Sequence, residues 1–357
     1  MSTTKRSFCI ILTLGFVTLF SAKAQSDISD LFKSGVNDIQ TLANGYIKPF
    51  GYGFSAGLGN NWYNTAATHK VLGFDITVGG NAVFTPSGDK TFSLSGLQNL
   101  TAVNGEKTAP TFGGKGDGVD LILQQKINGN TQTIASFRTP KGVSRVTPVP
   151  SFQVTLGLPL GNDLSVRFAP TINAGNYSGN MWGIGLKHNI KQWIPVLKLL
   201  PFDAAVMVGY TKFNLNYHFD DPVTPSDLVS NPNMISTPTG VSYNDQGLKL
   251  KANAVMVNAI ISKRIAFLTP YLGFGITRSS FDFNFTGNFP ILGNFNTNTQ
   301  KFDVTTLKDP IPLHYSLTQP GATIGLRMKL LWVFALHAQY TLQKYSTASV
   351  GFGLNFR

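Results

Sequence analysis

The stretch Ser349–Phe356, just before the final Arg357, reads Ser-Val-Gly-Phe-Gly-Leu-Asn-Phe. Every second side chain is large and apolar, and the residues between them are small or polar. A period of two places these two kinds of residue on opposite faces of a strand. A strand with one apolar and one polar face is typical of the wall of a transmembrane β-barrel, which separates lipid from a polar interior.

This terminal strand resembles the aromatic-ended C-terminal strand that the barrel-assembly machinery of outer membranes reads. It departs from the commonest form of that signal because Arg357 follows the last aromatic residue. We therefore expect the barrel-assembly machinery to be a partner during insertion.

The same alternation recurs along the chain and predicts an all-β protein, a transmembrane antiparallel β-barrel of about fourteen strands. A soluble β-sandwich is the alternative for such a pattern. The predicted strands lie at 50–59, 72–78, 91–96, 119–126, 131–138, 152–158, 164–168, 182–186, 207–217, 248–262, 272–276, 324–330, 334–342 and 350–356.

Composition favours the barrel over a soluble enzyme or a helical membrane protein. Only 13% of the residues are charged and 12% are aromatic, yet the mean hydropathy is +0.04. A soluble protein usually carries about a quarter charged residues, and a helical membrane protein is far more apolar. A wall that alternates apolar with polar or small residues averages to a value near zero.

The N-terminus has the layout of a secretory signal peptide over residues 1–24. Lys5 and Arg6 precede an apolar run at 8–20, and small residues lead up to an expected cleavage site before Gln25. A spanning helix needs roughly 20 apolar residues, and this run is shorter. The protein is therefore expected to be exported, with the outer membrane of a Gram-negative bacterium as its destination.

Residues 25–49 are predicted to form an N-terminal amphipathic helix, because apolar residues recur at three- and four-residue spacing from Asp27 to Ile47. We expect this helix to end near Gly45 and Pro49 and to plug the barrel or cap its periplasmic mouth. Residues 50–357 are expected to form the barrel.

Loop lengths predict the orientation of the barrel. Bacterial barrels have short periplasmic turns and longer outer loops. The long polar stretches 219–246 and 285–316 fall on one side of the predicted wall. The opposite, periplasmic side receives the connections 86–89, 128–130, 160–162, 189–202, 263–264 and 331–332.

No constellation for catalysis, cofactor binding or metal binding stands out, and the protein is not expected to be an enzyme. Cys9 is the only cysteine and lies in the predicted signal peptide, and the five histidines are scattered. Catalysis by a loop pair of His218 with Asp220 or Asp221 is the remaining alternative.

Cationic and polar residues at alternating strand positions are predicted to line the lumen. They are Arg167, Lys187, Lys212, Asn214, Asn216, Arg327, Lys329, His337 and Gln339. One interpretation is structural: the cations pair with carboxylates such as Asp30, Asp38 and Asp75, or meet lipopolysaccharide phosphates. The other is a basic pore that selects anionic or amphipathic solutes.

Residues 190–200 are predicted to form a short interfacial helix on the periplasmic rim. Trp193 would be its anchor at the level of the lipid headgroups.

Several motifs resemble those of an uncharacterised outer-membrane β-barrel family of Bacteroidota. They are Asn-Asn-Trp-Tyr-Asn-Thr-Ala at 60–66, His-Lys at 69–70, Gly-Phe-Asp at 73–75, Lys-His-Asn-Ile-Lys-Gln-Trp-Ile-Pro at 187–195, Leu-Pro-Phe-Asp at 200–203 and Gly-Tyr-Thr at 209–211. The resemblance implies a location and a fold, but no function. A looser likeness in layout is to fatty-acid-transporter barrels, although the Asn-Pro-Ala motif of their plug is absent from the N-terminal helix.

Two functions remain open. The first is passive passage of a small anionic, amphipathic or hydrophobic solute, narrowed by the N-terminal helix, because fourteen strands enclose more space than side chains fill. The second is a non-transporting scaffold or adhesin that acts through its long loops. The expected partners are outer-membrane lipid, lipopolysaccharide and a small solute, and nucleic acid is not expected.

Overall fold

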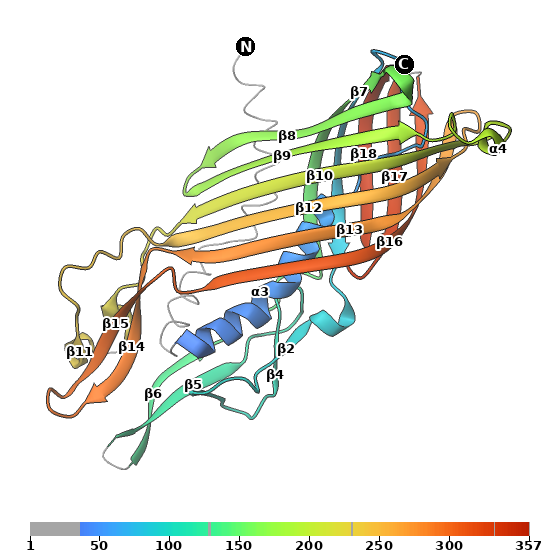
Figure 1. Ribbon diagram of the computed structural model, residues 1–357. Coiled ribbons are helices and arrows are strands. Elements are labelled where there is room, and N and C mark those ends of the chain that lie inside the picture. The colour runs from blue at the N-terminus through green and yellow to red at the C-terminus, as the bar shows by residue number, and fades with distance from the viewer. Residues whose placement is uncertain (1–35, 128–129, 230, 332, 357) are drawn as a thin grey trace.

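The computed structural model describes residues 36–127, 130–229, 231–331 and 333–356. Within these residues ten antiparallel strands form one closed barrel, which lies obliquely in Figure 1. The ring is closed because β1 pairs with β7 on one side and with β18 on the other. The barrel strands are β1 (Phe74–Phe84), β7 (Val146–Leu158), β8 (Asn162–Ala174), β9 (Tyr177–Asn189), β10 (Asp203–His218), β12 (Gly247–Ser262), β13 (Leu268–Thr286), β16 (Pro312–Leu330), β17 (Phe334–Leu342) and β18 (Thr347–Phe356).

The antiparallel barrel is confirmed, but the count of fourteen strands is wrong because four predicted strands lie outside the wall. One of them, 50–59, lies almost wholly within a helix, α3 (Val36–Leu58). The other three belong to the connection between β1 and β7 and form small sheets of their own. That connection contains η2 (Ser87–Asp89), β2 (Thr91–Ser93) paired with β4 (Thr108–Pro110), and β3 (Leu100–Ala102) paired with β5 (Asp120–Ile127), which also pairs with β6 (Asn130–Arg138).

The predicted boundary between helix and barrel at residue 50 is also wrong, because α3 continues to Leu58 and the first barrel strand begins at Phe74. Residues 49–58 of the helix are enclosed on all sides, so this part has no polar face from which a helical period can be recognised. Packing from every side also keeps it helical through Pro49, although an interior proline costs about 3 kcal/mol. The predicted signal peptide and the start of the predicted helix lie outside the described residues.

The long connections all lie at one end of the barrel, as predicted, and the other end carries only shorter ones (Figure 1). At the short-turn end lie η3 (Pro159–Gly161), residues 190–202 with the one-turn helix α4 (Pro195–Lys198), residues 263–267 and the β16–β17 turn. At the long-loop end lie the β1–β7 connection, the tight β8–β9 and β17–β18 turns, and two long loops containing η4 (Pro225–Leu228), η5 (Pro232–Met234), β11 (Ile235–Ser236), β14 (Asn288–Asn296) and β15 (Lys301–Lys308).

Two predicted periplasmic turns are misplaced. Residues 86–89 follow the outer end of β1, so they lie at the long-loop end. The turn at 128–130 joins β5 to β6 within the same connection, and its residues 128–129 lie outside the described part of the chain. The turn at 86–89 was misplaced because 50–59, which lies almost wholly in α3, was counted as the first wall strand, and the turn at 128–130 because strands of the small sheets were counted as wall strands.

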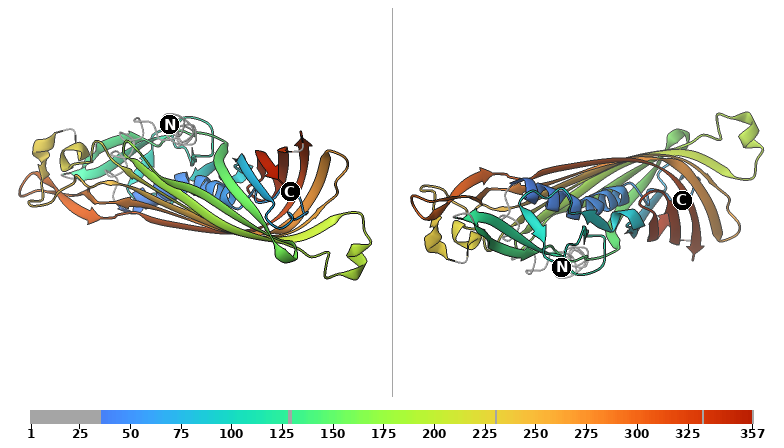
Figure 2. Two further views of the ribbon diagram at one scale, coloured as in Figure 1. Left: turned by 90° about the horizontal axis from the view of Figure 1, so that it is seen from above. Right: turned by 90° about the horizontal axis from the view of Figure 1, so that it is seen from below.

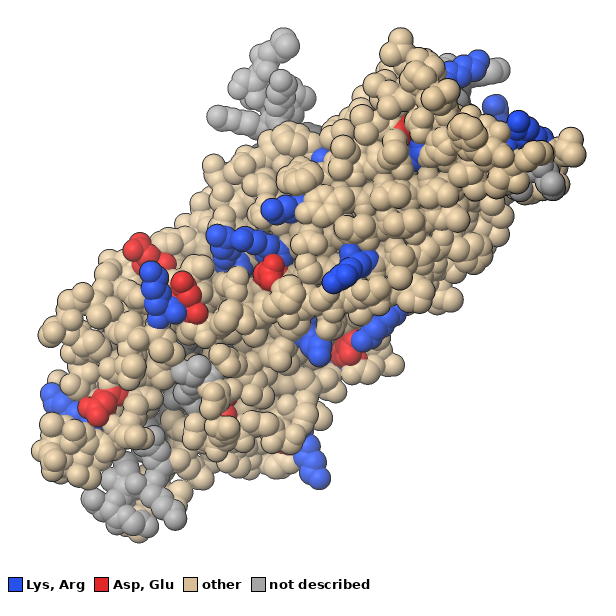
Figure 3. All heavy atoms as spheres, viewed as in Figure 1, with Lys and Arg blue, Asp and Glu red and all other residues tan. Residues whose placement is uncertain are grey.

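The outer surface of the wall carries an apolar belt. Side chains such as Phe274 (59% exposed), Leu272 and Ile276 point outward from β13. Towards the long-loop end the outward positions become polar, as with Lys251 on β12 and Arg278 on β13. Figure 3 shows a broad uncharged area between charged side chains on the long-loop half and at the opposite tip.

The core of the molecule fills the barrel. It joins the apolar side chains of α3 to those of the wall and continues into the sheets at the long-loop end. Both views of Figure 2 show α3 running lengthwise within the ring of strands. Among the described residues, no helix is both long and apolar enough to cross a membrane.

The pairing between β7 and β8 is incomplete. Their ladder extends from Leu158↔Asn162 to Gln153↔Arg167. Beyond that point, residues 146–152 of β7 pair with β1, and β8 pairs with β9 through residues 168–169 and 172–174, on either side of a β-bulge. We call this separation the β7–β8 seam. It lies in the half of the wall nearer the long-loop end.

Candidate functional site

The lumen is occupied by a plug made of α3 and the segment 59–73, which we call the strap. Phe50 packs edge-on against Phe281 of β13, with ring centroids 5.8 Å apart. Phe54 contacts Phe213 of β10 at 4.9 Å. The wall approaches so closely that a Cβ at Gly57 would lie 2.6 Å from a methyl carbon of Val149. Small helix residues therefore allow a helix to fit inside a narrow barrel, whose diameter is set by its strand number.

The strap continues from α3 to β1, and side chains of the wall bind its backbone. Arg167 of β8 donates to the carbonyl oxygens of Leu58 at 3.0 Å and Asn60 at 2.9 Å. Its guanidinium also lies over the ring of Trp62, 3.9 Å from the centroid. Hydrogen bonds from a charged donor are among the stronger ones in proteins, so Arg167 fixes the end of the helix and the start of the strap.

Trp62 is the largest buried side chain of the strap and lies on a floor of glycines. A Cβ at Gly209 would come within 2.8 Å of its indole ring, and one at Gly185 within 2.6 Å of Met207 and 2.8 Å of the indole. Gly183 and Gly185 of β9 and Gly209 of β10 thus make room for the plug.

A charged cluster fastens the other end of the strap. Asp163 of β8, whose side chain is 0% exposed, lies 2.9 Å from Lys187 Nζ and accepts hydrogen bonds from both the backbone N–H and the ring Nδ1 of His69. Lys187 also donates to the carbonyl oxygen of Ala67 at 2.8 Å. Because each buried charge has partners, the cluster avoids the large penalty for isolated ions in an apolar interior.

At the long-loop end, α3 is held by the β1–β7 connection. The carboxylate of Asp38, buried near the start of the helix, accepts the backbone N–H groups of Gln98, Asn99 and Leu100. In the β17–β18 turn, burial raises the pKa of the Tyr345 phenol, which donates to Asp89 at 2.6 Å. The helix is thus anchored at both of its ends.

The predicted lumen-facing residues fall into two groups. Six of the predicted residues face inward and are buried or partly buried. Five of them interact with the plug, or with β1 and β18 beside the point where the plug joins the wall. The sixth is hydrogen-bonded within the wall. In addition to Arg167 and Lys187, the contacts are Arg327 with Asp75 at 3.8 Å, Lys329 with Asn355 at 3.2 Å, His337 with Asn61 at 2.8 Å, and Gln339 with Tyr271 at 3.0 Å. Side chains engaged in this way do not line an open basic pore.

The inward assignment of Lys212, Asn214 and Asn216 is wrong. Phe213 contacts α3 inside the barrel, so alternation turns Lys212 and Asn214 outward. The apolar face of β10 was taken for its lipid face, but this part of the strand lies beside the plug. A strand with one apolar and one polar face has the same alternating sequence whether its apolar face contacts lipid or the protein interior.

The remaining candidates occupy exposed positions. Trp193 is 68% exposed in the β9–β10 connection, where its Nε1 donates to His188 Nε2 at 2.7 Å, and its anchoring role stays a prediction. The predicted helix 190–200 is reduced to α4. Asn176 donates to the backbone carbonyl of His218 and to the carboxylate of Asp220. Within the described part of the chain, no group of three or more histidine, cysteine, aspartate or glutamate side chains is placed to hold a metal ion.

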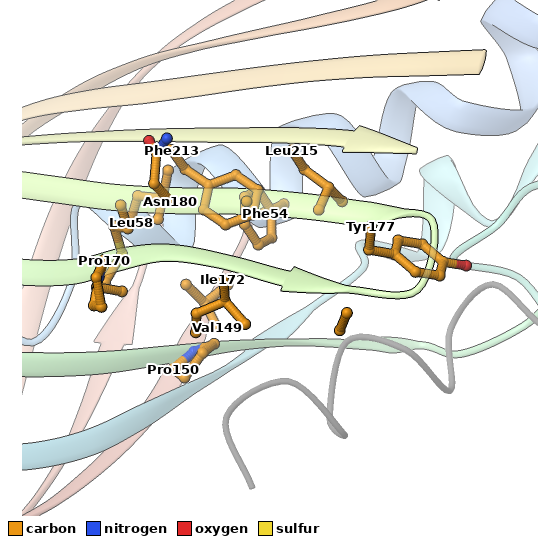
Figure 4. A pocket seen from close by; sticks show the side chains of 14 residues that line it. Phe54, Leu58, Val149, Pro150, Pro170, Ile172, Tyr177, Asn180, Phe213 and Leu215 are labelled. Atoms are coloured by element: carbon orange, nitrogen blue, oxygen red, sulfur yellow. The ribbon is translucent and has the colours of Figure 1, made fainter. Parts of the chain in front are cut away.

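An apolar pocket of about 90 Å³ lies between the plug and the β7–β8 seam. Figure 4 shows Phe54 and Leu58 of α3 on one side of it, with Pro150 of β7 and Pro170 of β8 on the other. Its polar side chains are Asn180 and Tyr177. The full lining is Phe54, Leu58, Val149, Pro150, Ala169, Pro170, Ile172, Ala174, Tyr177, Gly179, Asn180, Met181, Phe213 and Leu215.

Sequence reasoning missed this pocket. A signal was present, because Pro150 and Pro170 lie just beyond the ends of two predicted wall segments, 152–158 and 164–168, and a proline in a strand marks an edge or a bulge. The inner side of the pocket could not be predicted, because it is formed by the part of α3 whose alternating sequence at 50–59 had been interpreted as a strand.

A family model described as "Family of unknown function (DUF6588)" matches residues 1–356. This agrees with the resemblance to an uncharacterised family, whereas the restriction to Bacteroidota stays a prediction. No curated protein matches the chain.

Solved barrels resemble the chain only distantly. The N-terminal β-barrel domain of Pseudomonas aeruginosa OprF is 14% identical, with 55% of this chain and 94% of that one covered and a TM-score of 0.24. Ail, the attachment invasion locus protein of Yersinia pestis, is 8% identical, with 80% and 99% covered and a TM-score of 0.26. The translocator domain of the autotransporter NalP from Neisseria meningitidis is 9% identical, with 90% and 98% covered and a TM-score of 0.27. Likenesses this loose do not decide a function.

Proposed function

Because this chain belongs to the DUF6588 family, whose function is unknown, we propose a function from its own fold and pocket. It is an outer-membrane barrel that takes up a small hydrophobic or amphipathic solute through the apolar pocket beside its plug. The pocket is the observation that carries this proposal.

Placement in the outer membrane is supported by three features. The strands form a closed ring, in which β1 pairs with β18, and a closed barrel is one of the two folds that can cross a bilayer. Its outer surface carries the apolar belt. The predicted signal peptide and the terminal strand supply a route of export and insertion.

An open anion channel is disfavoured by the plug. The cations that would attract anions interact with the strap, β1 and β18, and the lumen along α3 is lined by packed aromatic rings. We therefore retain the amphipathic or hydrophobic solute, with or without a charged head, and drop the small hydrophilic anion.

The size and lining of the pocket indicate what part of a solute it holds. A cavity of about 90 Å³ is smaller than the roughly 150 Å³ apolar cavity that accepts benzene, so it fits only a few carbon atoms. The lining is almost wholly apolar, and the amide of Asn180 accepts a hydrogen bond from Asn214 on the outer face. This arrangement suits the tail of a single-chain amphiphile whose head stays outside the pocket, near those two amides.

We expect the protein, held in an amphipathic polymer, to bind radiolabelled decanoate in equilibrium dialysis. The variant Ala169→Phe should reduce this binding to background, because Ala169 lines the pocket and an added ring would fill it. Ala259→Phe is the matched control, since Ala259 lies on the outward face of β12. Equal binding by the protein and Ala169→Phe, or no binding by the protein, would refute the proposed function.

The scaffold alternative is favoured by one observation. The long loops are structured, with β14 and β15 forming a hairpin to which β11 adds in parallel. An ordered outer surface of this kind suits contact with another macromolecule. Removal of residues 285–316 without loss of decanoate binding would separate the two roles.

The orientation of the barrel is tested by labelling intact cells. A cysteine at Asn298, in the β14–β15 loop, should react with an impermeant maleimide, whereas one at Lys263, in the β12–β13 turn, should not. Both positions are exposed, so a difference in labelling reports the side of the membrane and not burial in the folded protein. Labelling at Lys263 alone would show that the long-loop end faces the periplasm.

A further inference from the structure

We infer that the β7–β8 seam is a lateral passage through which an apolar chain moves between the outer leaflet of the membrane and the pocket. This inference rests on the proposed function for its solute, but its geometry comes from the wall itself. The seam is the place where the pairing of two neighbouring wall strands stops partway, at Gln153↔Arg167.

Prolines lie where hydrogen bonds would otherwise close the seam. Gly157 donates to Gly73 and accepts from Leu72, so its backbone groups point towards the strap and β1. Backbone direction alternates along an antiparallel strand. Even-numbered residues of β7 therefore point towards β8, and these include Pro148 and Pro150.

The opposite edge has the same property. In the ladder Val154 lies opposite Val166, so the even-numbered residues of β8 point towards β7 as far as the β-bulge that follows Ala169, in which Pro170 is the first residue. Extending that register would bring Pro150 opposite Pro170. Neither residue has an N–H to donate, and a ladder cannot continue through two facing prolines.

The same prolines reduce the cost of an open seam. An unpaired backbone N–H in lipid costs several kcal/mol, which is why open sheet edges are avoided there. A proline leaves no N–H to be exposed at that position. Two strand edges can thus lie apart within a barrel wall with fewer unsatisfied groups.

The seam opens at the level where the apolar belt ends. Phe168 and Trp182, paired neighbours on β8 and β9, are exposed on the outside. At the same level of β10, Lys212 pairs with Trp182 and begins the polar band. An amphiphile in the outer leaflet would have its head beside that band and its tail beside the seam.

The pocket lies directly behind this opening. Pro150, Pro170 and Ile172 belong to both the unpaired edges and the lining of the pocket, and Phe54 and Leu58 of the plug form its inner side (Figure 4). The plug thus stops the tail from passing straight through the lumen. A solute arriving from the membrane would meet the pocket first.

The passage is tested with a fluorophore at Ile172→Cys in vesicles of phosphatidylcholine that carry a doxyl quencher on the acyl chain. The quencher cannot leave the bilayer, so strong quenching at Ile172 requires a path from lipid into the pocket. Val257→Cys on the outer face of β12 and Asn298→Cys in the long loop give the upper and lower limits.

Replacing Pro150→Val together with Pro170→Val restores two donors and should let the ladder extend. Quenching at Ile172 should then fall towards the Asn298 value. Pro320→Val is the control, because Pro320 lies on β16 within a complete ladder with β13 and should change nothing. If the double variant does not fold, Pro170→Val alone is expected to give a smaller decrease.

Quenching at Ile172 no greater than at Asn298 in the unaltered barrel would overturn the passage, as would quenching that the proline replacements leave unchanged. Decanoate binding by dialysis is independent of this result. Binding without quenching would refute the passage alone, and quenching without binding would refute the proposed function alone.

Discussion

Deleting residues 26–71 is expected to convert a barrel that is silent in planar bilayers into one that conducts in discrete steps. The deletion removes α3 and nearly all of the strap, which together fill the lumen. It exposes Arg167, Lys187, Arg327 and Lys329 to water, and these four cations outnumber the nearby carboxylates Asp75, Asp163 and Asp203. A confined passage with excess positive charge concentrates anions, so the open variant should prefer chloride.

Two further variants make this prediction specific. In the deleted background, Arg327→Glu with Lys329→Glu should reverse the preference towards cations. In the full chain, Ser55→Cys with Ser279→Cys should form a disulfide between helix and wall, because the two hydroxyl oxygens are 3.2 Å apart. That locked protein should remain silent. Conductance by the intact protein equal to that of the deletion would show that the plug does not close the barrel.

Asp163→Asn is expected to be the most destabilising conservative substitution in the wall. It leaves Lys187, 8% exposed, as a buried cation without its carboxylate, and breaking a buried ion pair in this way costs about 3–5 kcal/mol. The gel shift between folded and heat-unfolded forms should move to a lower temperature, by on the order of 10 °C.

Asp120→Asn is the matched control for this substitution. Asp120 also pairs with a cation, and the hydrogen bond from Arg138 lowers its pKa. That pair is exposed, however, and exposed pairs contribute little, so no change is expected. Adding Lys187→Met to Asp163→Asn should restore part of the lost stability, because it removes the unpaired charge. Equal effects of Asp120→Asn and Asp163→Asn would show that the buried cluster does not fasten the strap.

The sequence predicts the barrel well because the wall strands obey a simple rule. Val350, Phe352, Leu354 and Phe356 alternate with small or polar residues, and a membrane on one side enforces that pattern over the whole strand. The segregation of long and short connections follows from the same strands. Whether a strand belongs to the wall, in contrast, depends on which strands it pairs with, and alternation does not show this. The segments of β5 and β6 were predicted to be wall strands, but they pair with each other.

The site was harder to predict because its two sides come from different kinds of structure. Phe50 and Phe54 lie four residues apart on one face of a buried helix, yet in sequence they are also alternate members of a strand-like run. Phe213 packs on that helix rather than on lipid. Alternation gives the two faces of a strand but does not say what covers each, so the positions of Lys212 and Asn214 were reversed.

The strap enters β1 at the short-turn end, while α3 begins at the long-loop end. The chain is therefore threaded lengthwise through a ring that its own first and last strands complete. Closing the ring around a segment already in place avoids drawing a helix with bulky aromatic side chains through a finished wall. We therefore expect an order of events in biogenesis: the N-terminal segment takes its place while the wall is still an open sheet, and the pairing of β1 with β18 comes last.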